Sequence, residues 1–235
     1  MLLDLFRSGF APEALMQLLL FIPTILISLT VHEYCHGYAA YKCGDNTAMF
    51  HGRLTLNPLK HLDPIGTIMM LVFGFGYARP VPINPRNFNH YKRDLCIVSI
   101  AGPLSNVFLA FIGILLNYSV LQIISLQSDA TAIAALSSTL FEAWSSFIKL
   151  FVISNVTLAV FNLIPIPPLD GSRLLSVLLP ARISAKLDKY EQYIMLVVLA
   201  LLWFGKLDGI IIFLGNKLLS ALTFIIELIP FTFLQ

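Results

Sequence analysis

The sequence has little charge. Only 12% of its 235 residues are charged, about half the share found in soluble domains, whereas 57% are hydrophobic. A soluble protein of this size needs far more polar surface, so the composition argues against a soluble domain. The formal net charge of +2 creates no basic surface for nucleic acid, and we expect no nucleic-acid partner.

Cysteine is also scarce. The three cysteines, Cys35, Cys43 and Cys96, are scattered and odd in number, which excludes a disulfide framework and a CxxC pair. We interpret Cys43 and Cys96 as small apolar residues. The N-terminus lacks a basic segment before an apolar core and a small-residue cleavage site, so we expect no cleavable signal peptide.

What the sequence has is long apolar blocks, which are typical of a chain whose solvent is the membrane. The predicted spans are Ala14 to about Tyr41, Leu95–Leu116, Trp144–Ile164, Tyr193–Phe204 and Ile210–Ile229. The pattern predicts an all-α polytopic membrane protein with about five to six transmembrane helices. We expect a single membrane domain over 1–235, with a core at about 14–180, accessory C-terminal helices at about 190–230 and no PDZ-type module.

Between the first two full spans lies a shorter apolar block, Ile65–Phe75. Spanning the hydrocarbon takes roughly 20 residues, so we interpret this block as re-entrant or half-buried. It ends in a segment rich in Gly and Pro, Gly74 to Pro82, which cannot stay helical and is predicted to be β-like. Further along, we expect a mixed loop at Gln127–Ser138, with helical extensions as an alternative, and a short helix that follows Asp170-Gly171 up to Pro180.

Lysine and arginine gather in alternate loops. Seven of them lie between the first two full spans and four follow the third, whereas the loop between the second and third spans has no base before Lys149. Basic loops face the cytoplasm, so we expect the N-terminus to lie outside.

Residues 32–36 read His-Glu-Tyr-Cys-His, an H-E-x-x-H motif. His32 and His36 are four residues apart, so on a helix they share a face and both imidazoles can reach one Zn²⁺. Glu33 lies beside them, where it can act on a water activated by the metal. The alternative is a solvated helix end, but the three groups directly follow an apolar run, where ionisable groups are costly and usually functional.

A catalytic zinc usually has three protein ligands and an open position. The acidic residues at or near a later span are few, chiefly Glu142, Asp170 and Glu227. Asp170 follows three prolines that break a helix at membrane depth, which is tolerated where the backbone lines an enclosed or wet cavity. It also shares the cytoplasmic side with His32 and His36, whereas Glu142 lies on the far side. The alternative role for Asp170 is capping of the short helix that follows.

Two motifs together resemble a known family. The His32–His36 motif and the segment Asn162-x-x-Pro165-x-Pro167-x-Leu169-Asp170-Gly171 are similar to those of the site-2 protease family of intramembrane zinc metalloproteases. The second motif matches the N-x-x-P-x-P-x-L-D-G pattern at every specified position. Residues 101–106 resemble the middle core helix of that family, and residues 52–58 and 78–82 resemble its compact bacterial branch, which lacks a PDZ domain.

The resemblance implies one Zn²⁺ per chain, bound by His32, His36 and Asp170, with Glu33 as the general base. It implies an intramembrane zinc endopeptidase that hydrolyses a peptide bond within or near a transmembrane segment of a membrane-protein substrate. We expect it in the bilayer of a bacterial cell (inner) membrane, with the active site toward the cytoplasm.

The oxyanion needs further donors, for which Asn162 is the first candidate and Asn106 the second. For Asn106 the alternative is helix–helix hydrogen bonding. An unwound substrate needs backbone partners, and the segment Gly74–Ile83 offers either an edge for β-augmentation or a plain surface loop. We interpret His51, His61 and His90 as solvated loop residues without a catalytic role.

Two other functions compete with proteolysis. A proteolytically inactive, membrane-protein-binding relative is disfavoured because Glu33 and all three candidate ligands are intact. A metal transporter is disfavoured because such a protein needs metal ligands on several spans, whereas the sequence offers one compact cluster.

Overall fold

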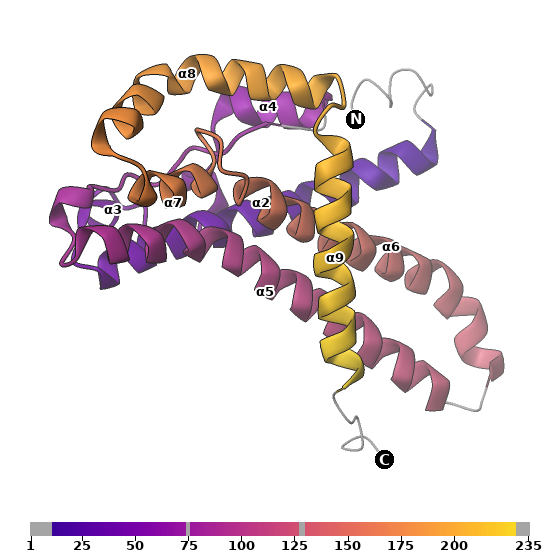
Figure 1. Cartoon of the computed structure of the whole chain (residues 1–235). Helices are drawn as coiled ribbons and strands as arrows, with labels where there is room; N and C mark the ends of the chain where they lie inside the picture. Colours follow the sequence, from indigo (N-terminus) through magenta and orange to yellow (C-terminus); the bar gives the residue numbers. More distant parts are fainter. Residues whose placement is uncertain (1–10, 74–75, 127–129, 229–235) are drawn as a thin grey trace.

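A computed structural model describes residues 11–73, 76–126 and 130–228, and every long regular element in these ranges is a helix (Figure 1). In chain order the elements are α2 (Pro12–Lys42), α3 (Thr47–Phe50), η1 (Pro58–Lys60), α4 (Pro64–Phe73), η2 (Pro85–Asn87), α5 (Tyr91–Leu126), α6 (Ala130–Asn162), α7 (Asp170–Leu178), α8 (Ala181–Trp203) and α9 (Asp208–Glu227). No β-strand occurs within the described ranges. The predicted all-α polytopic membrane fold is confirmed.

Four of the described helices are long and apolar enough to cross a membrane, namely Pro12–Lys42, Tyr91–Gln122, Leu140–Asn162 and Asp208–Glu227. The sequence predicted about five to six. The difference lies at Tyr193–Phe204, which is the second half of α8. The first half of α8 carries Arg182, Lys186 and Lys189, so the apolar stretch is shorter than the roughly 20 residues that a span needs.

Helices α2, α5 and α6 pack against one another, and α9 packs on α6 and α5. Since lipid offers no hydrogen-bond partners, these segments must form helices that satisfy their own backbone groups. Small residues such as Ala40 and Ala110, which are fully buried, let the helices approach closely. One apolar cluster, of Ala110, Ile148, Val152, Val156 and Leu222, joins α5, α6 and α9. A second, of Ala40, Cys43, Phe88, Leu95 and Val98, lies where α2 meets the start of α5, and it holds Cys43 as an apolar residue.

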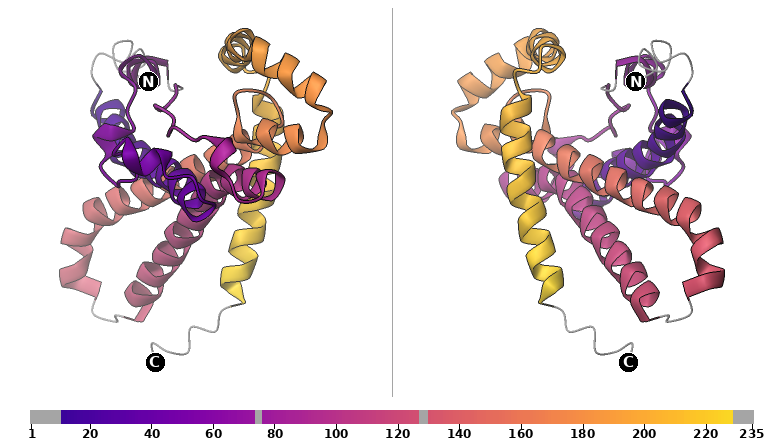
Figure 2. Two further views of the ribbon diagram at one scale, coloured as in Figure 1. Left: turned by 90° about the vertical axis from the view of Figure 1, so that its left-hand side faces the viewer. Right: turned by 90° about the vertical axis from the view of Figure 1, so that its right-hand side faces the viewer.

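Helices α4 and α8 lie on opposite sides above this bundle, with a non-helical segment between them (Figure 2). Their C-terminal ends meet through Phe73 and Trp203, whose rings are 5.2 Å apart and nearly perpendicular. Helix α4 has ten residues, which agrees with a block too short to span. The segment predicted to be β-like is non-helical over residues 76–83 and forms no strand there, while residues 74–75 lie outside the described ranges.

Helical extensions reach into the loop predicted at Gln127–Ser138: α5 continues to Leu126 and α6 begins at Ala130, while residues 127–129 lie outside the described ranges. The prediction about a signal peptide concerns residues 1–10, which also lie outside the described ranges. The short helix predicted after Asp170-Gly171 is α7. Its N-cap is Leu169 and no side chain caps it, so the capping role considered for Asp170 is not observed.

Candidate metal centre

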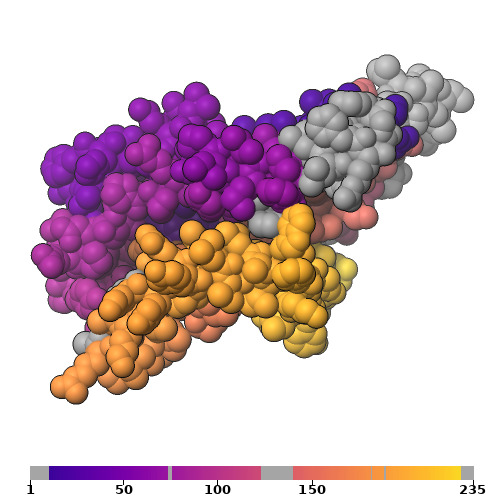
Figure 3. Space-filling view, turned by 90° about the horizontal axis from the view of Figure 1, so that it is seen from above, coloured from indigo at the N-terminus to yellow at the C-terminus, as the bar shows by residue number. Residues whose placement is uncertain are grey.

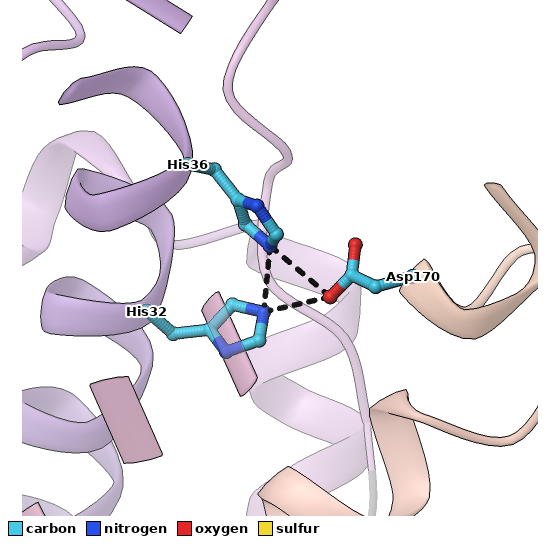
Figure 4. A group of neighbouring side chains, drawn as sticks. All are labelled: His32, His36 and Asp170. Carbon is cyan, nitrogen blue, oxygen red and sulfur yellow. Dashed lines mark hydrogen bonds and ion pairs between the residues drawn. The ribbon is translucent and has the colours of Figure 1, made fainter. Parts of the chain in front are cut away.

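Three side chains from two helices converge at one point (Figure 4). His32 and His36 lie one turn apart on α2, and Asp170 is the first residue of α7. The Nε2 atoms of the two histidines are 3.0 Å apart. Asp170 Oδ2 lies 3.2 Å from Nε2 of His32 and 3.1 Å from Nε2 of His36. Both histidines are buried, and among the described residues this is the only group of three or more His, Cys, Asp or Glu side chains that could hold a metal ion.

The second ring nitrogen of each histidine, Nδ1, is hydrogen-bonded to a residue of α5. His36 Nδ1 lies 2.7 Å from the carbonyl oxygen of Val98, which can only accept, so this nitrogen carries the proton. His32 Nδ1 lies 2.6 Å from Oδ1 of Asn106, whose Nδ2 donates to Asn155 Oδ1 at 2.9 Å. Asn106 therefore presents an acceptor to His32. In both rings the unprotonated Nε2 then faces Asp170, as metal-ligating histidines require.

These donors fit a zinc ion. Two imidazole lone pairs and a carboxylate face one another at 3.0–3.2 Å, which is repulsive unless a cation lies between them. Tetrahedral zinc with ligands at ~2.0–2.1 Å separates those ligands by roughly 3.3–3.4 Å, close to the observed spacing. A ligand carboxylate must be ionised, and a cation at this point would hold Asp170 in that form.

Gly102 on α5 lies directly against the two imidazoles. A Cβ atom at this position would lie 2.7 Å from Nε2 of His32 and closer still to Nε2 of His36. Any larger residue would fill the space in which the three ligands converge. The glycine of the Ala-Gly-Pro-Leu-Ser-Asn motif is therefore required for space, not for backbone conformation.

The three candidate ligands and Glu33 line one cavity of about 510 Å³. Its walls come from α2, residues 76–83, the start of α5, the end of α6, α7 and α8, which contributes Glu191, Gln192 and Met195. Seen from above, α4 with its following segment and α8 border a groove (Figure 3). Oε2 of Glu33 accepts a hydrogen bond of 2.9 Å from the backbone N–H of Val81, so this carboxylate is held by the segment that faces it.

The two candidate oxyanion donors lie in different places. Asn162 lines the cavity, and its Nδ2 donates to the Leu158 carbonyl at 3.0 Å, which leaves its second amide hydrogen available. Asn106 is fully buried behind His32, where it links α5 to α2 and α6 through Ser28 and Asn155. These contacts agree with the alternative role considered for Asn106, hydrogen bonding between helices, and its Oδ1 accepts from Nδ1 of His32.

Sequence reasoning missed several residues of the site. The Val98 carbonyl and the Val81 N–H are backbone groups, so the residue type at these two positions does not indicate their role. Gly102 was inside a recognised motif, and only its position facing His32 in space reveals its role. His61, interpreted as solvated, is 1% exposed, with its Nε2 2.7 Å from the carbonyl of Thr55.

Comparison with known proteins agrees with this geometry. Residues 20–205 match Peptidase family M50. The chain belongs to peptidase family M50. It is 45% identical over 195 residues to a Bacillus subtilis protein named "Putative zinc metalloprotease YwhC", covering 83% of this chain and 84% of that protein. Two proteins named "Putative zinc metalloprotease Rip2" are similar too. The one from Mycolicibacterium smegmatis is 30% identical over 194 residues, which cover 77% of this chain and 68% of that protein. The one from Mycobacterium tuberculosis is 29% identical over 190 residues, which cover 78% of this chain and 66% of that protein.

No solved structure matches the chain. The family match confirms the resemblance to the site-2 protease family. The M50 protein described here is therefore an integral membrane zinc metalloprotease, and zinc is its cofactor.

Proposed function

We propose that this M50 protease hydrolyses a peptide bond within or near a transmembrane segment of a membrane-protein substrate, with Glu33 as general base. The observation that carries the proposal is that Glu33 shares one cavity with three converging ligands, at the ends of apolar helices. The family match over residues 20–205 supports treating 1–235 as a single membrane protease domain.

His32, His36 and Asp170 are suited to hold the zinc. A zinc ion held there would polarise the scissile carbonyl and lower the pKa of a bound water toward neutrality. Glu33 takes a proton from the attacking water and later passes it to the leaving amine. The Val81 N–H restrains Oε2 of Glu33 and leaves Oε1 free for that proton. The second amide hydrogen of Asn162, in the cavity wall, can donate to the developing oxyanion.

A transmembrane substrate must unwind before cleavage, because each peptide bond in a helix is screened by its own turn. The unwound stretch then needs backbone partners. Residues 76–83 line the cavity without helix or strand pairing, which supports a role as an edge for β-augmentation.

The proposed location is a bacterial cell (inner) membrane with the site toward the cytoplasm. The basic segments that follow α2 and α6 support this orientation, because they come after the helices that carry His36 and Asn162. Arg173 and Glu191 in the cavity wall provide polar surface along which water can reach Glu33.

The competing functions account for fewer of the observations. An inactive binding protein does not need a carboxylate held in the cavity beside the ligands. A metal transporter needs successive ligand groups, whereas the described residues contain one.

The test compares wild type with Glu33→Gln and with Glu142→Gln, which makes the same change on an exposed side chain of α6. Each is expressed in cells, and membrane-protein fragments are compared by mass spectrometry. We expect Glu33→Gln to lose fragments by 10²-fold or more, about the contribution of a general base, and Glu142→Gln to match wild type. Identical fragments in wild type and Glu33→Gln would refute the proposal.

A further inference from the structure

Arg53 is a buried cation outside the site described above. Its side chain is only 7% exposed. It follows Gly52, whose φ of +62° makes the turn, and the Arg53 N–H donates to the carbonyl of Ala48 at 2.9 Å. Burial lowers the pKa of Arg53, the nearby charge of Arg79 lowers it further, and the charge of Glu33 acts in the opposite direction. Burying a guanidinium is costly, so its partners are informative.

Those partners are two carbonyls of the segment that faces Glu33. Arg53 Nη2 donates to the carbonyl of Arg79 at 2.6 Å and to that of Pro80 at 3.3 Å. The next residue is Val81, whose N–H donates to Oε2 of Glu33. The guanidinium therefore holds the chain immediately before the amide that restrains the base.

The rest of the same linker anchors the segment on either side. The Arg79 N–H donates to the carbonyl of His61 at 2.8 Å, and the Asn84 N–H donates to Oδ2 of Asp45 at 2.7 Å. Residues 45–61 thus form a support behind residues 79–84, and Arg53 is the part of that support that binds the two residues directly before Val81.

Two prolines explain why a cation is needed there. Pro80 and Pro82 have no backbone N–H, so over residues 80–82 only Val81 can donate, and it donates to Glu33. The segment therefore has to be anchored through its carbonyls. The Nη2 nitrogen of Arg53 carries two N–H donors, and the planar guanidinium fixes their directions toward the two neighbouring carbonyls, whereas the ammonium of lysine lies on a shorter, flexible stem.

We infer that Arg53 is a positioning residue for Glu33: by binding the carbonyls of Arg79 and Pro80, it holds the Val81 N–H against the carboxylate of the general base. The inference rests on the proposed role of Glu33. Misplacing a catalytic group by about 1 Å costs about 10²-fold in rate, so loss of the guanidinium should act on kcat by about that factor.

The kinetic test uses full-length, zinc-loaded Arg53→Ala, Arg53→Lys and Arg86→Ala in proteoliposomes. Arg86 is exposed on η2, outside the cavity wall, so its variant removes an equal charge from the same region between α2 and α5. The probe is a membrane protein whose cleavage depends on Glu33 in the comparison above. We expect Arg53→Ala to lower kcat about 100-fold with zinc content unchanged, Arg53→Lys to lower it about 10-fold, and Arg86→Ala to match wild type. Millimolar guanidinium should restore part of the activity of Arg53→Ala.

A second measurement is independent of activity. Hydrogen–deuterium exchange should be about 10-fold faster at residues 76–84 in Arg53→Ala and unchanged in α2. Unchanged exchange at 76–84, a kcat loss no larger than that of Arg86→Ala, or a loss that guanidinium does not restore would overturn the inference. Absence of Glu33-dependent cleavage in wild type would instead refute the proposed function, and exchange at 76–84 would then decide separately whether Arg53 holds the segment.

Discussion

The substitution Gly102→Ala tests the metal centre with a single methyl group. Alanine is favoured over glycine in a helix by about 1 kcal/mol, so the change does not weaken α5 itself. The added Cβ, however, would lie 2.7 Å from Nε2 of His32, whereas ordinary contact begins at 3.4 Å. The imidazole rings must therefore move away from the added Cβ by about 0.7 Å or more.

Hydrogen bonds restrain the two imidazole rings against such a movement. His32 is tied to Asn106 and His36 to the carbonyl of Val98, and each of these hydrogen bonds contributes about 0.5–1.5 kcal/mol that a displaced ring gives up. Disturbing such supporting contacts typically lowers metal affinity by 10–100-fold. Because Gly102→Ala disturbs both ligands and also occupies the space between them, we expect zinc affinity to fall by about 100-fold or more.

The assay is chelator competition on purified protein, with zinc per chain measured by mass spectrometry. Gly215→Ala on α9 is the control, since its Cβ would meet Val156 at an ordinary 3.5 Å. Helix content should be unchanged in both variants. If Gly102→Ala bound zinc as tightly as wild type and Gly215→Ala, the ligands would not converge where we place them.

Three further predictions follow from the same structure. Replacing Asn106 by leucine removes the acceptor behind His32 and should lower zinc affinity about 10–100-fold in the same competition assay; unchanged affinity would show that the support is dispensable. Burial alone raises the pKa of Asp45, but hydrogen bonds from Thr47 and Asn84 outweigh it and lower that pKa, so the ionised form stabilises the fold above about pH 4 and this contribution is lost as pH falls further. Asp45→Asn should therefore melt below wild type at pH 7, with the difference narrowing toward pH 3; a constant difference in melting temperature would contradict the linkage. Treatment with a zinc chelator should abolish Glu33-dependent cleavage and added zinc should restore it, whereas cleavage that persists in metal-free protein would contradict metal-dependent hydrolysis.

The convergence of the three candidate ligands could be predicted because its signals are local. The four-residue spacing places His32 and His36 on one helix face, and the prolines before Asp170 mark a helix break on the same side of the membrane. Long apolar runs likewise predict helices, since lipid permits little else. The length of α8 was harder to predict, because its apolar half resembles a short span while the helix begins earlier, in charged residues.

What the sequence did not reveal acts through the backbone or through ambiguous side chains. Nothing in the identity of Val81 or Val98 indicates that its amide or carbonyl contacts Glu33 or His36. An amide such as Asn106 donates and accepts, so only its neighbours decide between supporting His32 and binding an oxyanion. Arg53 lay within a recognised motif, but its role depends on the path of residues 79–81 in space.

The central claim is that His32, His36 and Asp170 hold the zinc that this protease uses. X-ray absorption spectroscopy of the purified protein, with zinc counted per chain, tests it most directly. We predict one zinc per chain with two imidazole nitrogens and carboxylate oxygen at ~2.0–2.1 Å, and loss of that zinc in the double variant His32→Ala, Asp170→Ala. A wild-type protein that carries no more zinc than the double variant, or zinc with sulfur ligands at ~2.3 Å, would contradict the account.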